Sequence, residues 1–138
     1  MRVVSKAFRT WSKKVQRRLL YATFENGSMR FIVRKRPATR TFVAFSDGSQ
    51  VMGWLMVFPT PFGKCANVFV NERFRGRGVA DRLFEAALRR EQRLFAFGWD
   101  PHSRGLFRRV KKRHPGRLVI RDWQKFKARY GPLQDYCL

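Results

Sequence analysis

Residues 68–80 read VFVNERFRGRGVA, and this stretch decides the fold. Its first residues, Val68–Val70, are β-branched and aromatic and predict a strand, and the amphipathic stretch Val79–Glu91 that follows the two glycines predicts a helix. A strand that leads through a glycine turn into a helix N-terminus is typical of a phosphate-binding cradle, because the free N–H groups and the helix dipole favour negative charge there. Arg75 and Arg77 add two cations to the turn. A plain strand-to-helix connection would use the same glycines, so the elements around the turn have to decide.

The clearest β signal lies just before this stretch. Thr41–Phe45 and Gln50–Phe58 predict a hairpin around the turn Asp47-Gly48, and Lys64–Asn71 predicts the strand that enters the glycine turn. Further strands are predicted over Met29–Val33, Arg93–Trp99 and Arg117–Ile120, and further helices over His102–Arg113 and Asp122–Tyr130. This order of elements predicts a single twisted mixed sheet flanked by helices, in the α/β (α+β) class.

The N-terminal segment predicts a basic amphipathic helix from about Ser5 to Tyr21. Its apolar residues recur every three or four positions, and they are Val4, Phe8, Trp11, Val15 and Leu19. A basic amphipathic helix can lie on an anionic membrane or on nucleic acid. We expect instead that its apolar side packs on the sheet and leaves the basic side outside.

Length and composition limit the class of protein. The 138 residues predict one domain over residues 1–138, and 44% hydrophobic residues are enough for a core. No apolar run reaches the roughly 20 residues of a membrane span, and no signal peptide is evident. Cys65 and Cys137 lie far apart, so we expect free thiols, no metal site and a cytoplasmic protein, in a host cytoplasm or a virion if the chain is viral.

The charge is extreme and unevenly distributed. Lys and Arg number 31 against nine Asp and Glu, which gives a formal net charge of +22. Residues 1–40 hold 12 cations and one acid, and residues 101–138 hold 11 cations and two acids, whereas the middle is nearly balanced. A field of this sign and size predicts a polyanionic partner such as nucleic acid or a ribonucleoprotein.

With this order in place, the chain resembles the GCN5-related N-acetyltransferase (GNAT) superfamily over about residues 41–120. Arg75-Gly76-Arg77-Gly78-Val79-Ala80 is similar to the family's acetyl-CoA signature, Gln/Arg-x-x-Gly-x-Gly/Ala, and lies after a strand and at the start of a helix. Asp100-Pro101-His102-Ser103-Arg104-Gly105-Leu106-Phe107 is similar to the family's Asn-x-x-Ala-x-x-Leu/Phe-Tyr, with Asp100, Ser103 and Phe107 at the Asn, Ala and Tyr positions.

The resemblance implies a site for acetyl-CoA. The backbone of Arg75–Ala80 (Arg75, Gly76, Arg77, Gly78, Val79 and Ala80) would bind the pyrophosphate. The preceding strand would splay from its neighbour, and Phe69, Val70 and Asn71 would pair with the pantetheine arm. An N–H group of that strand would polarise the thioester carbonyl, as acyl transfer requires.

The catalytic groups of the family are not evident in this sequence. Phe107 stands at the position of the thiolate-protonating Tyr, and no carboxylate occupies Lys64–Asn67. Glu72, His102 and Cys65 remain as candidates. We expect Glu72 to pair with Arg73 or Arg75 at the surface, His102 to lie near a helix start, and Cys65 to be a buried thiol.

Two classes of function therefore stand side by side. The first is an acetyl-CoA-dependent N-acetyltransferase that acts on an amine of an acidic or nucleic-acid-associated acceptor. The second is a catalytically silent protein of the same fold that binds nucleic acid or assembles a virus or phage particle. Attachment to a membrane surface through residues 5–21 is a third and weaker hypothesis.

Overall fold

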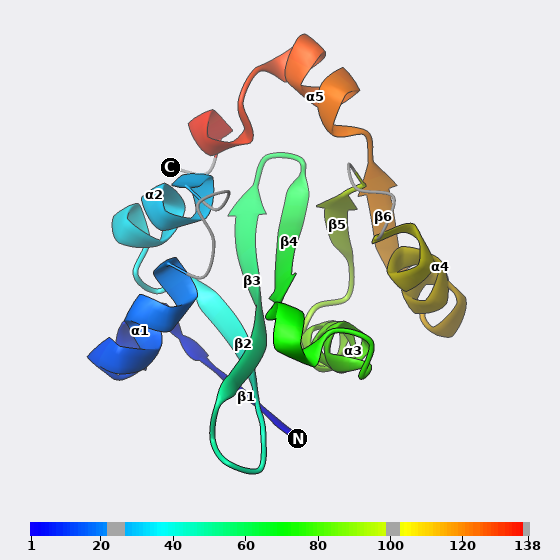
Figure 1. The fold of residues 1–138 in the computed structure, drawn as a ribbon. Helices are drawn as coiled ribbons and strands as arrows, with labels where there is room; N and C mark the ends of the chain where they lie inside the picture. Colours follow the sequence, from blue (N-terminus) through cyan, green and yellow to red (C-terminus); the bar gives the residue numbers. More distant parts are fainter. Residues whose placement is uncertain (22–26, 99–102, 137–138) are drawn as a thin grey trace.

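A six-stranded mixed sheet forms the centre of the molecule (Figure 1), in the computed structural model that describes residues 1–21, 27–98 and 103–136. Its spatial order follows the chain, and the strands are β1 (Arg2–Ala7), β2 (Arg40–Phe45), β3 (Val51–Thr60), β4 (Gly63–Val70), β5 (Leu94–Phe97) and β6 (Leu118–Arg121). The helices are α1 (Lys13–Leu20), α2 (Gly27–Lys35), α3 (Val79–Arg90), α4 (Ser103–Arg113) and α5 (Trp123–Tyr130), with short 3-10 turns η1 (Phe8–Thr10), η3 (Glu72–Phe74) and η4 (Leu133–Tyr136). This architecture confirms the fold class predicted from the sequence.

Helices cover both faces of the sheet because the central strands carry apolar side chains on both faces, and each face therefore has to be buried. In β2, Phe42 and Ala44 join one core with α3 and α4, whereas Val43 and Phe45 join a second core with α1, α2 and α5. Strand β3 is buried from Met52 to Phe58, which is typical of a strand covered on both faces. The central strands of the sheet are therefore held between two cores, and the glycine turn before α3 packs on the first of them through Phe74 and Val79.

The strand pairing in the sheet changes from antiparallel to parallel between β4 and β5. Strands β1 to β4 are antiparallel, and the β4–β5 and β5–β6 pairs are parallel. In the part of the chain that the structure describes, β4 and β5 share one register pair, Cys65 with Phe95. Along the same strand, β3 keeps pairing with β4 as far as Gly53 with Val70. From residue 66 onward β4 has parted from β5, as the resemblance implied.

The predicted N-terminal helix is wrong in its first half. Residues Arg2–Ala7 form β1 and pair antiparallel with β2, and α1 begins only at Lys13, where the Ser12 side chain accepts a hydrogen bond from the Val15 amide at 3.3 Å. The apolar residues of the strand β1 and of the helix α1 fall at helical spacing along the sequence only by coincidence. Pairing with β2 decided the outcome, because local periodicity is a weaker constraint than a full ladder of sheet hydrogen bonds. Leu19 is buried on the sheet, so the apolar side of α1 packs inward as expected.

The strand predicted over Met29–Val33 is a helix. Residues Gly27–Lys35 form α2, and Ile32 and Val33 are buried in the second core. Two adjacent β-branched residues suggested a strand, but helix packing against the sheet buries the same two side chains. The remaining predicted strands and helices are present, with bounds that differ by at most two residues at either end.

The C-terminal segment closes the end of the sheet near the β3–β4 turn (Figure 1). The guanidinium of Arg121 lies 5.4 Å from the ring centre of Phe62, 5.7 Å from Phe95 and 5.3 Å from Phe126, so α5 is held over the strands by cation–π and aromatic contacts. Within the described residues, no helix has the length and apolar character needed to cross a membrane.

Candidate active site

The glycine turn gives α3 an uncapped N-terminus. Gly76 and Gly78 both have positive φ, +77° and +75°, in the left-handed region that other residues rarely adopt. An added Cβ would meet nothing within 4 Å at either position, so the backbone conformation, and not crowding, requires glycine. Gly78 is the N-cap residue and has no side chain to bond the first amides of α3. These amides are available to an anion.

Phe74 anchors the turn and was not singled out in the sequence. Its ring is buried in the core with α3, and the guanidinium groups of Arg73 and Arg77 lie over it, each 5.6 Å from its centre. Arg75 is used differently, because its Nε donates to the Val70 carbonyl at 3.1 Å. The turn therefore keeps Arg77 beside the amides and ties Arg75 back to β4.

An ion pair between α3 and α4 fixes the other side of this helix start. Arg109 donates two hydrogen bonds of 3.1 Å to the two oxygens of Asp81, and Arg113 lies 3.8 Å from the same carboxylate. The hydrogen bond and the charge of Asp81 raise the pKa of Arg109 above its ordinary value. The one acid in the first turn of α3 is thereby neutralised by its neighbours, which reduces its repulsion of an anion at the turn.

The end of β4 lies between the two halves of the site. Phe69 is half-buried, and its ring lies 5.7 Å from that of Trp54 of β3, centre to centre, at a tilt of 33°, whereas Val70 faces the opposite core with α3. The Asn71 amide donates to the Met52 carbonyl at 2.9 Å, and the Asn71 side chain accepts from the Arg73 amide at 3.1 Å. Asn71 thus ends the strand and starts the turn.

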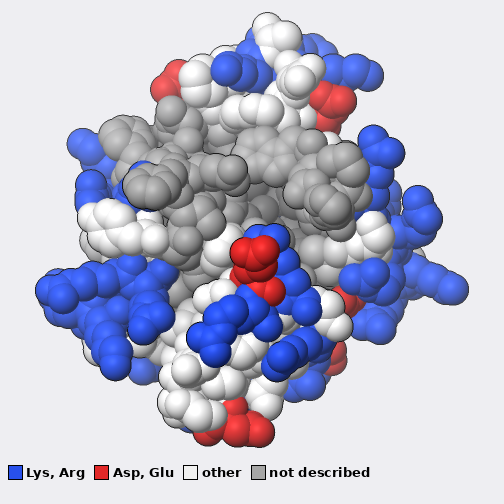
Figure 2. All heavy atoms as spheres, viewed as in Figure 1, with Lys and Arg blue, Asp and Glu red and all other residues white. Residues whose placement is uncertain are grey.

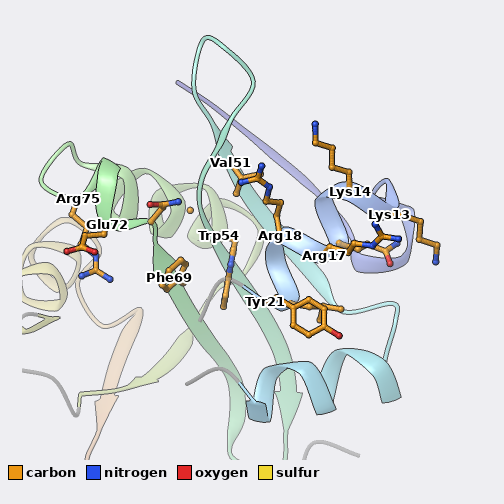
Figure 3. Close-up of a pocket in the computed structure, with 14 residues that line it drawn as sticks. Lys13, Lys14, Arg17, Arg18, Tyr21, Val51, Trp54, Phe69, Glu72 and Arg75 are labelled. Carbon is orange, nitrogen blue, oxygen red and sulfur yellow. The ribbon is translucent and has the colours of Figure 1, made fainter. Parts of the chain in front are cut away.

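A pocket of about 960 Å³ opens beside this strand end (Figure 3). Helix α1 and Tyr21 form one wall, β3 and Phe69 form the floor, and the residues after β4 form the other wall. The residues that line it are Lys13, Lys14, Gln16, Arg17, Arg18, Leu20, Tyr21, Val51, Gly53, Trp54, Phe69, Asn71, Glu72 and Arg75. The pocket therefore meets the candidate acetyl-CoA site at Phe69, Asn71 and Arg75.

The wall formed by α1 is strongly cationic. Lys13, Lys14, Arg17 and Arg18 are spaced so that they share one side of the helix, and all four are at least partly exposed. In the part of the chain that the structure describes, none of them has an acidic partner. The sequence indicated a basic helix here, but it did not indicate that the helix borders a pocket.

Trp54 is an unexpected feature of the pocket floor. Its side chain is 1% exposed, and its indole Nε1 is the one buried side-chain polar atom without a hydrogen-bond partner among the described residues. A buried, unpaired N–H donor costs free energy, so its presence beside a pocket is a feature of the site that needs a reason. The sequence alone could not show that the indole N–H of Trp54 is unpaired, because a Trp in an apolar strand is normally part of the core.

Of the three catalytic candidates, the structure places Glu72 at the pocket. Glu72 is exposed and forms no ion pair with any described residue, so its expected pairing with Arg73 or Arg75 is wrong; Arg75 is occupied by the Val70 carbonyl. Cys65 is buried in the second core and does not line the pocket. His102 lies outside the described residues.

The second family-like segment is described only from Ser103 onward. Asp100 lies outside the described residues, and Ser103 is the first residue of α4. Phe107 is buried and contacts Phe84 of α3 edge-on at 6.1 Å. Among the described residues, no group of three or more His, Cys, Asp or Glu side chains could hold a metal ion.

The glycine turn and the strand before it lie within a region that matches a known protein family. The model of the acetyltransferase (GNAT) family matches residues 3–110. The chain belongs to this family. Members of the family transfer acetyl groups and generally use acetyl-CoA as the co-substrate, and the resemblance seen in the sequence is thereby confirmed.

The chain was also compared with curated proteins and with solved structures. Among curated proteins, none matches. Among solved structures, the chain is similar to a crystal structure from Exiguobacterium sp. 255-15 described as a "putative acetyltransferase", with 19% sequence identity and a TM-score of 0.43 over 77% of this chain and 84% of the other.

Proposed function

We propose that this GNAT-family chain transfers the acetyl group of acetyl-CoA to an amine of an anionic acceptor. The observation that carries the proposal is the parting of β4 from β5 directly before the uncapped start of α3. A parted strand offers backbone groups to an extended ligand, and an uncapped helix start offers amides to a pyrophosphate. The parted end of β4 and the start of α3 follow one another along the chain, so one extended ligand could contact both.

The residues present fit acetyl-CoA. The amides that follow Gly76 and Gly78 would bind the pyrophosphate, with Arg77 beside them and Asp81 already neutralised by Arg109. Phe69, Val70 and Asn71 would line the arm that leads to the thioester. When bound, acetyl-CoA supplies the acetyl group and a thiolate leaving group. Asp100, Ser103 and Phe107 remain proposed members of this site; of these, Ser103 and Phe107 lie in the first half of α4.

Glu72 is the residue that we assign to the acceptor amine. Among the described residues it is the one carboxylate that lines the pocket, and it follows the end of β4 (Figure 3). An acceptor bound in the pocket would meet the thioester there. As general base it would take a proton from the incoming ammonium, so that the nitrogen lone pair is free to attack the carbonyl carbon. The C–N bond would form as the C–S bond breaks, and the second proton that the nitrogen loses on becoming an amide would pass to the thiolate sulfur. A β4 amide would stabilise the negative oxygen of the transition state.

The charge of the pocket supports an anionic acceptor. Of the described residues, five cations line it, Lys13, Lys14, Arg17, Arg18 and Arg75, against the single carboxylate of Glu72. Such a wall attracts an acceptor that carries carboxylate or phosphate groups near its amine, and it repels polyamines and other cationic acceptors. The net charge of the whole chain acts in the same direction.

A pair of matched glycine variants tests the cofactor site. Gly78→Glu adds a side chain and a negative charge to the cradle, and Gly116→Glu makes the same change at a second left-handed glycine (φ +72°) in the α4–β6 connection. Both variants carry the same backbone strain, so both are expected to have a lower melting temperature. We expect acetyl-CoA to raise the melting temperature of the wild type and of Gly116→Glu, and to leave that of Gly78→Glu unchanged.

Two results would overturn the cofactor assignment. One is a wild-type chain whose melting temperature does not respond to millimolar acetyl-CoA. The other is a full response in Gly78→Glu. If Gly78→Glu does not fold, Arg77→Glu replaces it, because Arg77 is exposed and its backbone conformation is not at issue; its response to acetyl-CoA should then be clearly weaker than that of the wild type.

A further inference from the structure

The cations of α4 fall into two groups. Arg109 and Arg113 face α3 and pair with Asp81. The other four, which we call the α4 stripe, are Arg104, Arg108, Lys111 and Lys112. All four are exposed, and none has an acidic partner among the described residues. Their spacing of four, three and one places them along one side of the helix.

The α4 stripe faces away from the protein. Phe107 and Val110 turn the opposite side of α4 into the core shared with α3, so the stripe lies on the outer surface of the molecule. Figure 2 shows Lys and Arg side chains gathered at the right-hand margin, where Figure 1 places α4. Helix α1, which borders the pocket, packs in the other core. The stripe and the pocket are therefore two separate cationic surfaces on opposite faces of the sheet.

The surroundings of the α4 stripe favour one kind of polyanion. The exposed large apolar side chains in the described residues are Tyr21 and Val119, and neither lies on α4. A helix that lies in a membrane surface needs apolar side chains to insert, and a protein partner needs apolar or aromatic anchors at the centre of its interface. Binding to single-stranded nucleic acid uses exposed aromatic rings, and the one aromatic ring of α4, Phe107, is buried. A duplex bound through its phosphates needs only the cations.

The dimensions also suit a duplex. Lys112 is the eighth residue after Arg104, which corresponds to about 12 Å along the helix axis. The major groove of B-form DNA is about 12 Å wide, and phosphates border it on both sides. Four flexible cations along such a length can reach several phosphates without reading the bases.

We propose that the α4 stripe is a docking surface for duplex nucleic acid, bound through its phosphate backbone without sequence preference. It holds the chain on a duplex while the pocket on the other sheet face stays open to an acceptor. This surface does not depend on the proposed acetyl transfer, since its residues lie outside the pocket. A chain that binds duplexes and does not acetylate would retain it.

The test compares two variants of equal charge. In the stripe variant, Arg104, Arg108, Lys111 and Lys112 are replaced by Gln; in the control, four exposed cations of α3 and α5 are replaced by Gln, namely Arg89, Arg90, Lys125 and Lys127. Binding to a DNA duplex of mixed sequence, about 20 base pairs long, is measured by fluorescence anisotropy between about 50 and 200 mM salt. For every phosphate that a variant no longer neutralises, the slope of log K against log salt should become shallower by about 0.9.

We expect the wild type to bind with a steep salt dependence. In the stripe variant the slope should be smaller by up to about 3.6 and the affinity at about 0.1 M salt should be lower by at least about 100-fold, whereas the affinity of the control should fall by less than about fivefold. Circular dichroism and the acetyl-CoA thermal shift should be the same in all three proteins, which separates this proposal from the cofactor site.

Several outcomes would overturn the proposal. A wild type that does not bind the duplex does so directly. Equal decreases in affinity in the two variants would show that net charge alone attracts DNA. Tighter binding to single strands, to an acidic peptide or to vesicles with about 30% anionic lipid, abolished in the stripe variant, would assign the surface to that partner instead.

Discussion

The two halves of the candidate site are built from different parts of the chain. The half proposed for acetyl-CoA consists of backbone: two left-handed glycines, an uncapped helix start and a parted strand end. The half proposed for the acceptor consists of side chains: the cations of α1, the rings of Trp54 and Phe69, and the carboxylate of Glu72. A backbone site depends on conformation, and a side-chain site depends on charge and shape. The two halves should therefore respond to different substitutions.

The largest effect is expected where the two halves meet, at Glu72. Glu72→Gln removes the proposed base and leaves the shape of the pocket unchanged, so kcat should fall by about 10² to 10⁴ while the acetyl-CoA thermal shift stays the same. Glu85→Gln, an exposed carboxylate of α3 paired with Arg89, is the control.

An unchanged rate in Glu72→Gln would contradict the role of Glu72 as general base. It would leave acetyl-CoA binding intact and assign proton removal to a group other than Glu72. A loss of the thermal shift in the same variant would instead place Glu72 in the cofactor half.

The second effect concerns the charge of the acceptor half. Lys13→Glu combined with Arg17→Glu reverses two cations of the α1 wall, and the KM for a carboxylate-bearing amine should rise at least about tenfold at low salt. The acetyl-CoA thermal shift should not change. Lys125→Glu combined with Lys127→Glu changes the net charge equally on α5, away from the pocket, and should raise KM much less.

Preference for acceptors provides the complementary measurement. With the wild type, a peptide that carries acidic residues near its amine should be acetylated faster than a basic peptide of the same length. A preference for the basic peptide would contradict the anionic acceptor, and the cofactor site would be untouched by that result.

The same division explains what the sequence could predict. The strand, glycine turn and helix over Val68–Glu91 were predicted correctly, because glycine spacing and apolar periodicity act locally. The sheet hairpin around Asp47-Gly48 was predicted for the same reason. The part of the site made of backbone could therefore be placed from the sequence, although its use by acetyl-CoA stays a prediction.

The acceptor half depends on tertiary contacts, and the sequence did not reveal it. Residues 5–11 were predicted as helix because β1 and α1 together mimic helical spacing. This error hid the fact that α1 borders the pocket and the residues before it do not. Trp11 is spaced as a helix residue, yet its indole donates to the Thr41 hydroxyl at 2.6 Å and ties the segment to β2. Pairing between segments about 30 residues apart leaves no periodic signal.

A smaller effect is expected at Gly53, which connects the halves. A Cβ at this position would lie 2.6 Å from the Phe69 carbonyl oxygen and 3.1 Å from the Val70 Cα, so Gly53→Ala must displace the end of β4. Crowding of this kind costs about 1–3 kcal/mol, which should lower the melting temperature by several degrees. Acetyl-CoA affinity should also fall a few-fold, because the displaced atoms belong to the cofactor strand.

The control for Gly53→Ala lies in the same sheet. Gly48, in the β2–β3 turn, has open space around it, with the Ser46 hydroxyl at 3.9 Å as its nearest neighbour. Gly48→Ala should change the melting temperature much less than Gly53→Ala. Equal effects in the two variants would contradict the close approach of β3 to β4.

The smallest effect is expected at Trp54, and its sign is informative. The indole N–H is buried without a partner among the described residues, so Trp54→Phe removes an unsatisfied donor and leaves an aromatic ring to contact Phe69. The smaller ring volume and the removed penalty oppose each other, and the free energy of unfolding should change by less than about 1 kcal/mol. If the acceptor pairs with this N–H, kcat/KM should fall by about 5- to 10-fold while the acetyl-CoA thermal shift is unchanged. A decrease of more than about 2 kcal/mol in stability with kcat/KM unchanged would instead make Trp54 a structural residue, and the cations of α1 would then carry acceptor recognition alone.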